Sequence, residues 1–245
     1  MDKTFIDVIN NYLSFSLKNV NVLNVKKSFT IENYYDIENT IILPISGKFR
    51  FGRYKKIINH DELLFVPAHN VMSLSFGSNR SSKLAYDDFI DNKGRYLIED
   101  NGFRNNLNVD KYFIMNIDVK AFDLINIFHS KYLKSFVISK NSKILSLIKD
   151  IMRERYHNHP GSKKIIELIS SQILYEIIRI ILSKQPMFSS IEENFKFFND
   201  NKTLDLFHFI DFNLEKELSN RVLSNHLNIS EDYVGQFFRN NIGFS

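Results

Sequence analysis

Short runs of β-branched and aromatic residues alternate with turn residues through the first half of the chain, from about 20 to 119. The stretch Thr40 to Gly77 shows this pattern most clearly, with turn residues at Ser46-Gly47 and at 67–70. Several short strands at this spacing indicate an antiparallel β-sandwich or β-barrel. The polar stretch 91–110 is expected to be a loop or an irregular hairpin.

Beyond this region the apolar spacing becomes helical. Three segments, 121–133, 142–158 and 162–184, place apolar residues at i, i+3 and i+4. Ser162 is expected to N-cap the third segment after the Pro160-Gly161 turn. The apolar arc of this segment is wider than one neighbour usually covers. Two interpretations stay open: a helix buried wholly within the chain, or a helix that also packs on a second copy of itself.

The second interpretation predicts a homodimer, with one part of the apolar arc facing the second copy. The residues assigned to this contact are Ile166, Ile173, Leu174, Ile177, Ile178 and Ile181.

The polar stretch 186–203 is predicted to be a linker, and the segment after it predicts three further helices. These helices are expected at Leu204 to Glu215, Asn220 to Leu227 and 231–241. The turn between the last two is short, with Ile229 on its inner side. This is helix-turn-helix spacing, in which the second helix is free to lie in a DNA major groove.

The last residues, SEDYVGQFFRNNIGFS from Ser230, contain the pattern Ser-x-x-Tyr-Val-x-x-x-Phe-Arg-x-x-x-Gly. This stretch resembles the first helix-turn-helix of the AraC/XylS transcription regulators. The strand patterns at 42–52 and 60–74 are similar to the cupin-like regulatory domain of that family. Two features depart from the family: Asn220 stands where an aliphatic residue is usual, and no second helix-turn-helix follows. The resemblance therefore predicts a regulator truncated after its first helix-turn-helix.

The resemblance implies an α+β fold in four parts: a β-rich, cupin-like effector-binding domain at 1–120, a helical dimerisation region at 121–185, the linker at 186–203 and a helix-turn-helix at 204–245. It also implies base-facing positions at Asp232, Gly235 and Gln236 on the helix 231–241. Glutamine is suited to an adenine edge and aspartate to a cytosine amino group. Arg239 and Asn240 suit phosphate contacts, which position a protein without specifying sequence.

The charge distribution weakens this interpretation for the chain acting alone. The whole chain carries +4, with a pI near 9.0, but the segment 204–245 holds three cations and six anions. Since phosphate neutralisation supplies most non-specific affinity, we expect weak DNA binding by this chain alone. The alternative is an effector-binding or dimerisation module that does not bind DNA and acts through mixed dimers.

The sequence offers little for catalysis or metal binding. It contains no cysteine, and the two histidines His60 and His69 of the β region are too few for a cupin metal site. The His157 to His159 stretch is more simply a solvated turn. We expect no enzyme activity, no cofactor and no metal, but a small-molecule effector in the β domain. Without a signal peptide or an apolar membrane span, a cytoplasmic protein is expected.

Overall fold

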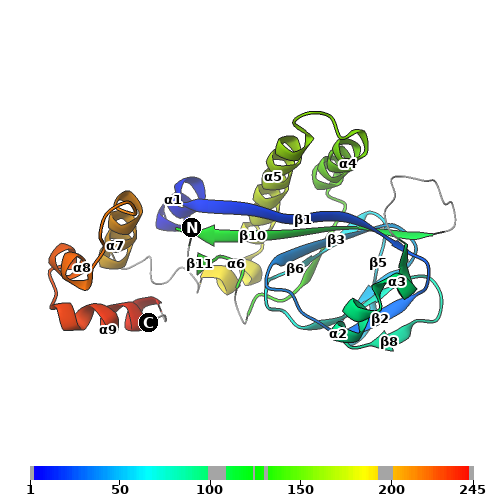
Figure 1. Ribbon diagram of the computed structural model, residues 1–245, viewed down its shortest axis with the longest axis horizontal. Helices are drawn as coiled ribbons and strands as arrows, with labels where there is room; N and C mark the ends of the chain where they lie inside the picture. The colour runs from blue at the N-terminus through cyan, green and yellow to red at the C-terminus, as the bar shows by residue number, and fades with distance from the viewer. Residues whose placement is uncertain (1–2, 99–108, 124, 130–131, 193–200, 243–245) are drawn as a thin grey trace.

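The computed structural model describes residues 3–98, 109–123, 125–129, 132–192 and 201–242. The fold is mixed α+β, with two β-sheets, a pair of long helices and a separate group of helices at the C-terminal end (Figure 1). No helix in these ranges is both long enough and apolar enough to cross a membrane.

The larger sheet has the strand order β12-β6-β3-β10-β1-β9, with β11 paired to β10, over the described residues. Its centre is the long antiparallel pair β1 and β10, which keeps register from Leu13 opposite Ala121 to Val25 opposite Asp110 apart from one bulge near Leu17. The strands are β1 Leu13–Val25, β3 Asn39–Ser46, β6 Glu62–Val66, β9 Leu97–Ile98, β10 Asp110–Ala121, β11 Ile125–Asn126 and β12 Phe136–Ser139.

The smaller sheet has the order β5-β4-β7-β2-β8 over the same described residues. Its strands pair antiparallel except β2 and β8, which are parallel. They are β2 Phe29–Tyr34, β4 Phe49–Phe51, β5 Lys56–Ile58, β7 Met72–Phe76 and β8 Ser82–Leu84. The two sheets share one hydrophobic core and so pack as a sandwich, as one of the two expected β architectures has it, and the described strands form no closed barrel.

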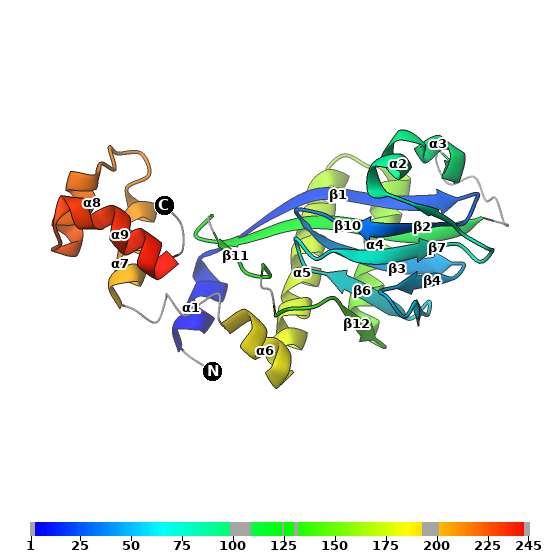
Figure 2. The ribbon, with the colours of Figure 1, turned by 90° about the horizontal axis from the view of Figure 1, so that it is seen from below.

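Most helices lie outside the sandwich. In Figures 1 and 2, α4 and α5 cover the larger sheet on the side away from the smaller sheet, while α2 and α3 lie beside the smaller sheet. The helices are α1 Lys3–Asn11, α2 Tyr86–Asp91, α3 Lys93–Tyr96, α4 Ser142–His157, α5 Ser162–Leu182, α6 Gln185–Glu192, α7 Asn201–Phe212, α8 Asn220–Leu227 and α9 Glu231–Ile242.

The larger sheet is buried on both faces, and the two-residue period of its strands divides the side chains between two cores. On β6, Leu63 and Phe65 face the helices, while Leu64 and Val66 face the smaller sheet. Strand β10 alternates in the same way, with Tyr112 on the side of the smaller sheet. The result is three layers: a helix pair, the larger sheet and the smaller sheet.

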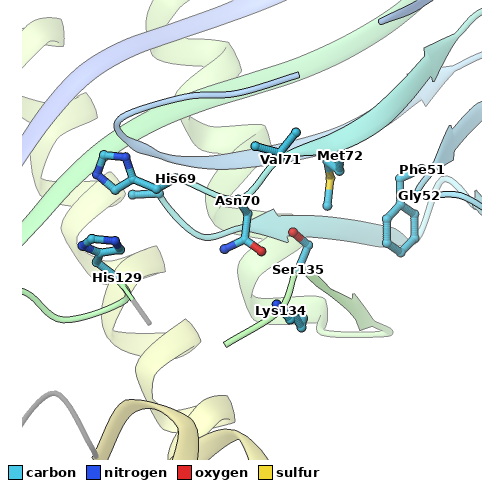
Figure 3. Close-up of a pocket in the computed structure, with 10 residues that line it drawn as sticks. Phe51, Gly52, His69, Asn70, Val71, Met72, His129, Lys134 and Ser135 are labelled. Atoms are coloured by element: carbon cyan, nitrogen blue, oxygen red, sulfur yellow. The ribbon is translucent and has the colours of Figure 1, made fainter. Parts of the chain in front are cut away.

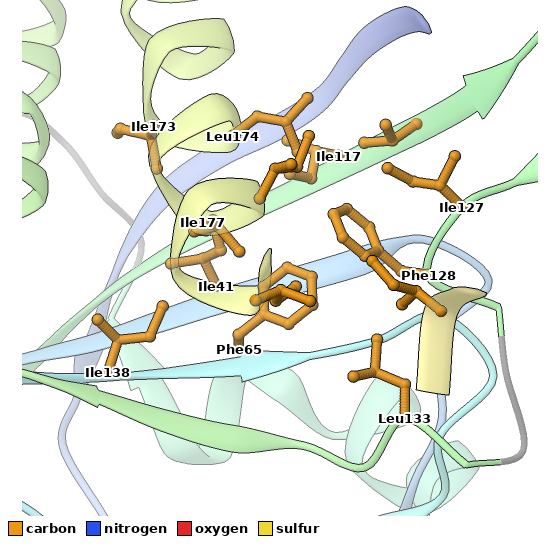
Figure 4. Close-up of a cluster of buried hydrophobic side chains, with 14 of the residues drawn as sticks. Ile41, Phe65, Ile117, Ile127, Phe128, Leu133, Ile138, Ile173, Leu174 and Ile177 are labelled. Atoms are coloured by element: carbon orange, nitrogen blue, oxygen red, sulfur yellow. The ribbon is translucent and has the colours of Figure 1, made fainter. Parts of the chain in front are cut away.

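Helix α5 supplies the centre of the core between the helices and the larger sheet (Figure 4). Ile173 and Ile177 pack in one cluster with Ile41, Phe65 and Ile117 of the sheet, and each of these five is fully buried. The wide apolar arc of α5 is explained by two neighbours in the same chain, since the helix packs on α4 and also on the sheet.

This packing corrects the choice of residues for the dimer contact. Five of the six, all except Ile166, are at most 2% exposed and lie in the core of the chain itself, and the half-buried Ile166 packs against the same core. The intrachain interpretation of this stripe is therefore the correct one. The apolar residues of α5 that do face outward are Ile165 and Leu168.

The segment 121–133 is not the helix that its apolar spacing predicts. Phe122 and Asp123 both have positive φ, a left-handed backbone that ends regular structure for such residues. The chain then forms the short strand β11, and Ile127 donates its backbone N–H to the Val119 carbonyl. The apolar residues here pack in the core between the helices and the larger sheet without forming a helix. Their spacing therefore wrongly predicted a helix.

Two smaller expectations also need correction. Ser162 is the first residue of α5 rather than its N-cap, which is Gly161 at φ 90°, and the Ser162 hydroxyl donates instead to Glu154 on α4. The predicted linker is helical in its described parts, because α6 covers its beginning and α7 its last residues. Phe188 and Ile191 of α6 are buried in the core between the helices and the larger sheet, so α6 belongs to the same folded domain.

Candidate DNA interface and ligand pockets

Helices α8 and α9 are joined by a turn of three residues, 228–230. Asn228 adopts the left-handed conformation (φ 52°, ψ 48°), and its backbone N–H donates to the Ser224 carbonyl. Ile229 donates to the same carbonyl, so α8 ends sharply. Both backbone N–H groups thus donate to one carbonyl at the end of α8. After the three-residue turn, α9 begins at Glu231.

The two helices and α7 share a small core of their own. Leu223 and Leu227 of α8 pack with Val234 and Phe237 of α9 and with Leu206 of α7. Ile229 is half-buried against this cluster, as the sequence predicts. Outside the cluster, the His226 ring stacks on Phe209, with 3.9 Å between ring centroids, which ties α8 to α7.

The opposite face of α9 has no partner within the described residues. Asp232, Gly235, Gln236 and Arg239 are all exposed, as are Glu231 and Tyr233. The side chain of Asn240 lies outside the described part of the structure. The predicted base-facing positions thus lie on one solvent-facing side of a helix whose other side is packed.

Gly235 has no structural reason to be glycine. Its backbone has no positive φ, and a Cβ added there would meet nothing within 4 Å. An interior helical glycine costs about 1 kcal/mol relative to alanine. This position therefore gives up helix stability without a packing benefit in the isolated chain.

The helix α7 contacts the N-terminal domain as well as α8. Phe207 is 2% exposed and belongs to the core between the helices and the larger sheet, whereas Leu206 belongs to the core of the C-terminal helices. The Phe207 ring stacks on Phe122, whose ring in turn stacks on Tyr12. The C-terminal helices are therefore joined to the β domain by packing as well as by the chain.

A first cavity, of about 350 Å³, lies between the two sheets and beneath α2 and α3. Its walls are largely apolar, and the cation nearest its rim is Lys93 of α3, which is exposed. The apolar lining consists of Leu23, Phe29, Ile31, Ile42, Leu74, Phe76, Phe89, Ile90, Leu97 and Ile114. Phe29 and Phe76 stack within this wall, with 5.1 Å between their ring centroids.

One end of this cavity is polar and contains a group of hydrogen bonds around Asp36. The hydroxyl of Tyr34 donates to Asp36 Oδ2 (3.0 Å), and the Asn116 amide donates to the same oxygen (2.9 Å). Burial, followed by the charge of Asp36, raises the pKa of Tyr34 far above its ordinary value. The same two causes raise the pKa of Tyr86 on α2. The tyrosine hydroxyls at this end are therefore neutral donors at every physiological pH.

A second cavity, of about 440 Å³, opens between the 67–72 loop and the segment that leads into β12 (Figure 3). It is called the histidine cleft below, and its lining residues are Phe51, Gly52, Ala68, His69, Asn70, Val71, Met72, His129, Lys134 and Ser135. The sequence suggested His69 only as a metal ligand and did not group it with the other lining residues, because they come from distant segments with no shared motif.

No group of three or more histidine and acidic side chains lies close enough to hold a metal ion in the described part of the chain. His60 and His69 are not in contact: His60 lies near the Pro44 carbonyl, whereas His69 contacts Tyr35 and His129.

No protein-family model and no curated protein matches the chain. Several solved structures are similar over nearly its whole length. Apo ToxT from Vibrio cholerae strain SCE256, a single-residue variant, gives a TM-score of 0.39 at 10% identity, with 95% of each chain covered. Wild-type ToxT from the same strain, with an unsaturated fatty acid bound, gives 0.36 at 8% identity, covering 96% of this chain and 94% of that one. The AraC-like transcriptional activator CuxR gives 0.31 at 8% identity, covering 97% and 83%. At scores and identities this low, function has to be argued from the residues of the chain itself.

Proposed function

We propose that this protein is a transcription regulator of the AraC/XylS type that places α9 in a major groove of DNA. The observation that carries the proposal is the pair α8 and α9: a three-residue turn, a closed core on one side and an unpartnered polar face on the other. Helix-turn-helix proteins use this arrangement to present the second helix to base edges.

Within this proposal the residues of α9 have distinct roles. Gln236 donates and accepts against an adenine edge, and Asp232 accepts from a cytosine amino group. Gly235 lets the helix backbone approach the groove, since no side chain stands there. Arg239 and Asn240 contact phosphates and hold the register of α9.

The charges of the C-terminal helices limit the affinity. Glu231 and Asp232 begin α9 with two exposed carboxylates, and Arg239 is the cation in its last turn. Carboxylates near phosphates oppose the counterion release that drives non-specific binding. We therefore propose that this chain binds DNA weakly as a single copy and gains affinity as a homodimer, since two linked modules bind more tightly than one.

The proposed effector site is the cavity between the sheets. Ligand pockets are typically apolar with a few polar groups that fix orientation, and this cavity has apolar walls, a hydrogen-bonded polar end and Lys93 at its rim. A mainly apolar small molecule with one polar or anionic end fits this description. The effector would act on α9 through α7, whose Phe207 packs in the core of the β domain.

The test is selection of bound duplexes from a random DNA library by the 245-residue chain, at low salt and at physiological salt. The proposal predicts an enriched motif that is lost when Gln236 and Arg239 are replaced together. No enrichment at either salt, from a protein whose circular dichroism shows a folded chain, would contradict it.

The acidity of the C-terminal helices favours one second candidate. In this alternative the chain is a regulatory module that binds an effector and forms mixed dimers, without contacting DNA. The same selection separates the two functions: ligand binding in the sandwich cavity without DNA enrichment supports the module, whereas an enriched motif supports the regulator.

A further inference from the structure

The histidine cleft combines potential cations with an apolar wall. In Figure 3 the rings of His69 and His129 lie together at one end, Phe51 and Gly52 lie at the other, and Asn70, Lys134 and Ser135 lie between them. None of the ten described residues that line the cleft is acidic. The cleft is thus positive on one side when its histidines are protonated, and apolar at Phe51, Val71 and Met72.

The cleft is held in shape by contacts that reach across the chain. The Tyr35 hydroxyl lies 2.6 Å from His69 Nδ1, and the backbone N–H of His69 donates to the Asp36 carbonyl at 2.8 Å. His69 itself has a φ of 63°, a left-handed backbone that is uncommon for residues other than glycine. The Asn70 amide donates to the Leu133 carbonyl at 3.3 Å, which joins the two walls.

Two side chains in the cleft lack a partner within the described residues. The hydroxyl oxygen of Ser135 is buried and makes no hydrogen bond there. Lys134, next to it, is exposed and forms no ion pair with a described carboxylate. Buried polar groups in folded proteins are nearly always paired, so the unpaired Ser135 hydroxyl in the wall of the cleft is a donor left free for a bound group.

We propose that the histidine cleft is a second ligand site, distinct from the sandwich cavity, that takes a small organic carboxylate with an aromatic or short aliphatic body. The carboxylate accepts from Lys134 and from the Ser135 hydroxyl, with the histidine pair beside it. The apolar body lies toward Phe51 and Met72. Charge-assisted hydrogen bonds of this kind are the stronger class in proteins.

The histidine pair adds a measurable signature. His69 and His129 have ring centroids 4.5 Å apart, and burial together with the charge of His69 lowers the pKa of His129. Among the described residues, His69 lies in contact with His129, Tyr35 lies beyond His69, and Lys134 lines the same cleft. An anion bound beside His129 stabilises the protonated imidazole ring and therefore raises the pKa of His129.

The experiment titrates phenylacetate into the folded chain without DNA, by calorimetry and by NMR of the histidine ring resonances. Its matched neutral probe is 2-phenylethanol, and inorganic phosphate tests an anion without an apolar body. We expect saturable binding of phenylacetate, binding at least about tenfold weaker for 2-phenylethanol and for phosphate, and an upward shift of the His129 pKa in the phenylacetate complex.

Four variants locate the site. Lys134→Gln is expected to weaken phenylacetate about tenfold, because it removes a charged hydrogen bond. Ser135→Ala is expected to weaken it severalfold without lowering the melting temperature, since the lost hydroxyl has no protein partner. Lys163→Gln removes an exposed lysine of α5 and should leave the affinity unchanged. Lys93→Gln removes the lysine at the sandwich cavity and therefore reports any phenylacetate that binds there instead.

Three results would overturn the proposal. Equal affinity for phenylacetate and 2-phenylethanol would show that charge plays no part. An affinity that falls with Lys93→Gln and not with Lys134→Gln would move the ligand to the sandwich cavity. Displacement of phenylacetate by equimolar Zn²⁺ at His69 and His129 would make the pair a metal site instead. Because no DNA is present, each result is independent of the proposed regulator function.

Discussion

Tyr12 and His208 lie within hydrogen-bond distance although 196 positions separate them in the sequence, with 3.1 Å between Tyr12 Oη and His208 Nδ1. Their rings meet edge to face, and Tyr12 also stacks on Phe122. His208 is on α7, so this contact joins the residue just before β1 to the C-terminal helices. Helix α7 is therefore packed on the β domain as well as on α8.

Phe207→Ala is expected to lower the free energy of unfolding by about 3 to 5 kcal/mol, the usual cost of truncating a buried phenylalanine. Phe212→Ala is the matched control on the same helix, because Phe212 is 78% exposed. The control should change stability by less than about 0.5 kcal/mol. Urea unfolding followed by circular dichroism measures both. Equal effects of the two substitutions would mean that α7 does not pack on the β domain in solution.

Gly235→Ala is expected to stabilise the chain by about 1 kcal/mol, since the new methyl group meets open space and alanine favours the helix. If the α9 backbone lies close to DNA, the same substitution weakens DNA binding even though the melting temperature rises. Thermal unfolding and fluorescence anisotropy with a selected duplex report the two quantities separately. A more stable variant with unchanged affinity would remove Gly235 from the proposed interface.

Gln236→Ala is expected to relax sequence preference at one operator position, at a cost of about 1 to 3 kcal/mol against the preferred base. Asn225→Ala, an exposed change on α8, serves as the control and should leave preference intact. The affinity of each variant for a set of duplexes with single base changes measures the sequence preference at every operator position. Unchanged preference at every position would exclude Gln236 from base contact.

The spacing of apolar residues was a sound guide wherever one face of an element is buried. The inward residues Val234 and Phe237 of α9 follow from that spacing. It failed at 121–133, where the left-handed residues Phe122 and Asp123 break a pattern that reads as helical. A positive φ at a phenylalanine has no signature in the sequence.

The ligand cavities were beyond sequence reasoning for a different reason. The aromatic wall at Phe29 and Phe76 could be predicted as a group, because aromatic residues of neighbouring strands share a core. The histidine cleft could not, because His69 and Lys134 meet only through the pairing of β6 with β12. That register depends on the whole larger sheet.

Glu176→Gln is expected to destabilise the chain near neutral pH and to have little effect in acid. Glu176 of α5 pairs with Lys143 of α4 at 3.0 Å and with Arg179 at 2.8 Å. The hydrogen bond from Lys143, opposed in part by burial, keeps the pKa of Glu176 below its ordinary value of about 4.5. A lowered folded pKa contributes stability above the unfolded value, and that stability is lost as the pH falls through the folded pKa.

The two proteins should therefore differ at pH 7 by up to about 1 kcal/mol, the range for partly exposed ion pairs. Their unfolding curves should converge only below the lowered folded pKa of Glu176, where the glutamate is protonated in both the folded and the unfolded state. Glu167→Gln, which removes an exposed pair with Lys164 on the same helix, is the control with a smaller effect. A difference that persists below this folded pKa would show that the Glu176 carboxylate contributes by packing rather than by charge.

Leu168→Asp separates a dimer contact from the core of the chain. Leu168 is 61% exposed on α5, so a charge there leaves the single chain folded and weakens only an interface with a second copy. Ile177→Asp places an unpaired charge in the core instead, which costs several kcal/mol and is expected to unfold the domain. Sedimentation velocity should show a folded Leu168→Asp protein of half the native mass if the native protein is a dimer through this face. A native dimer that keeps its mass in this variant would place the interface on another surface.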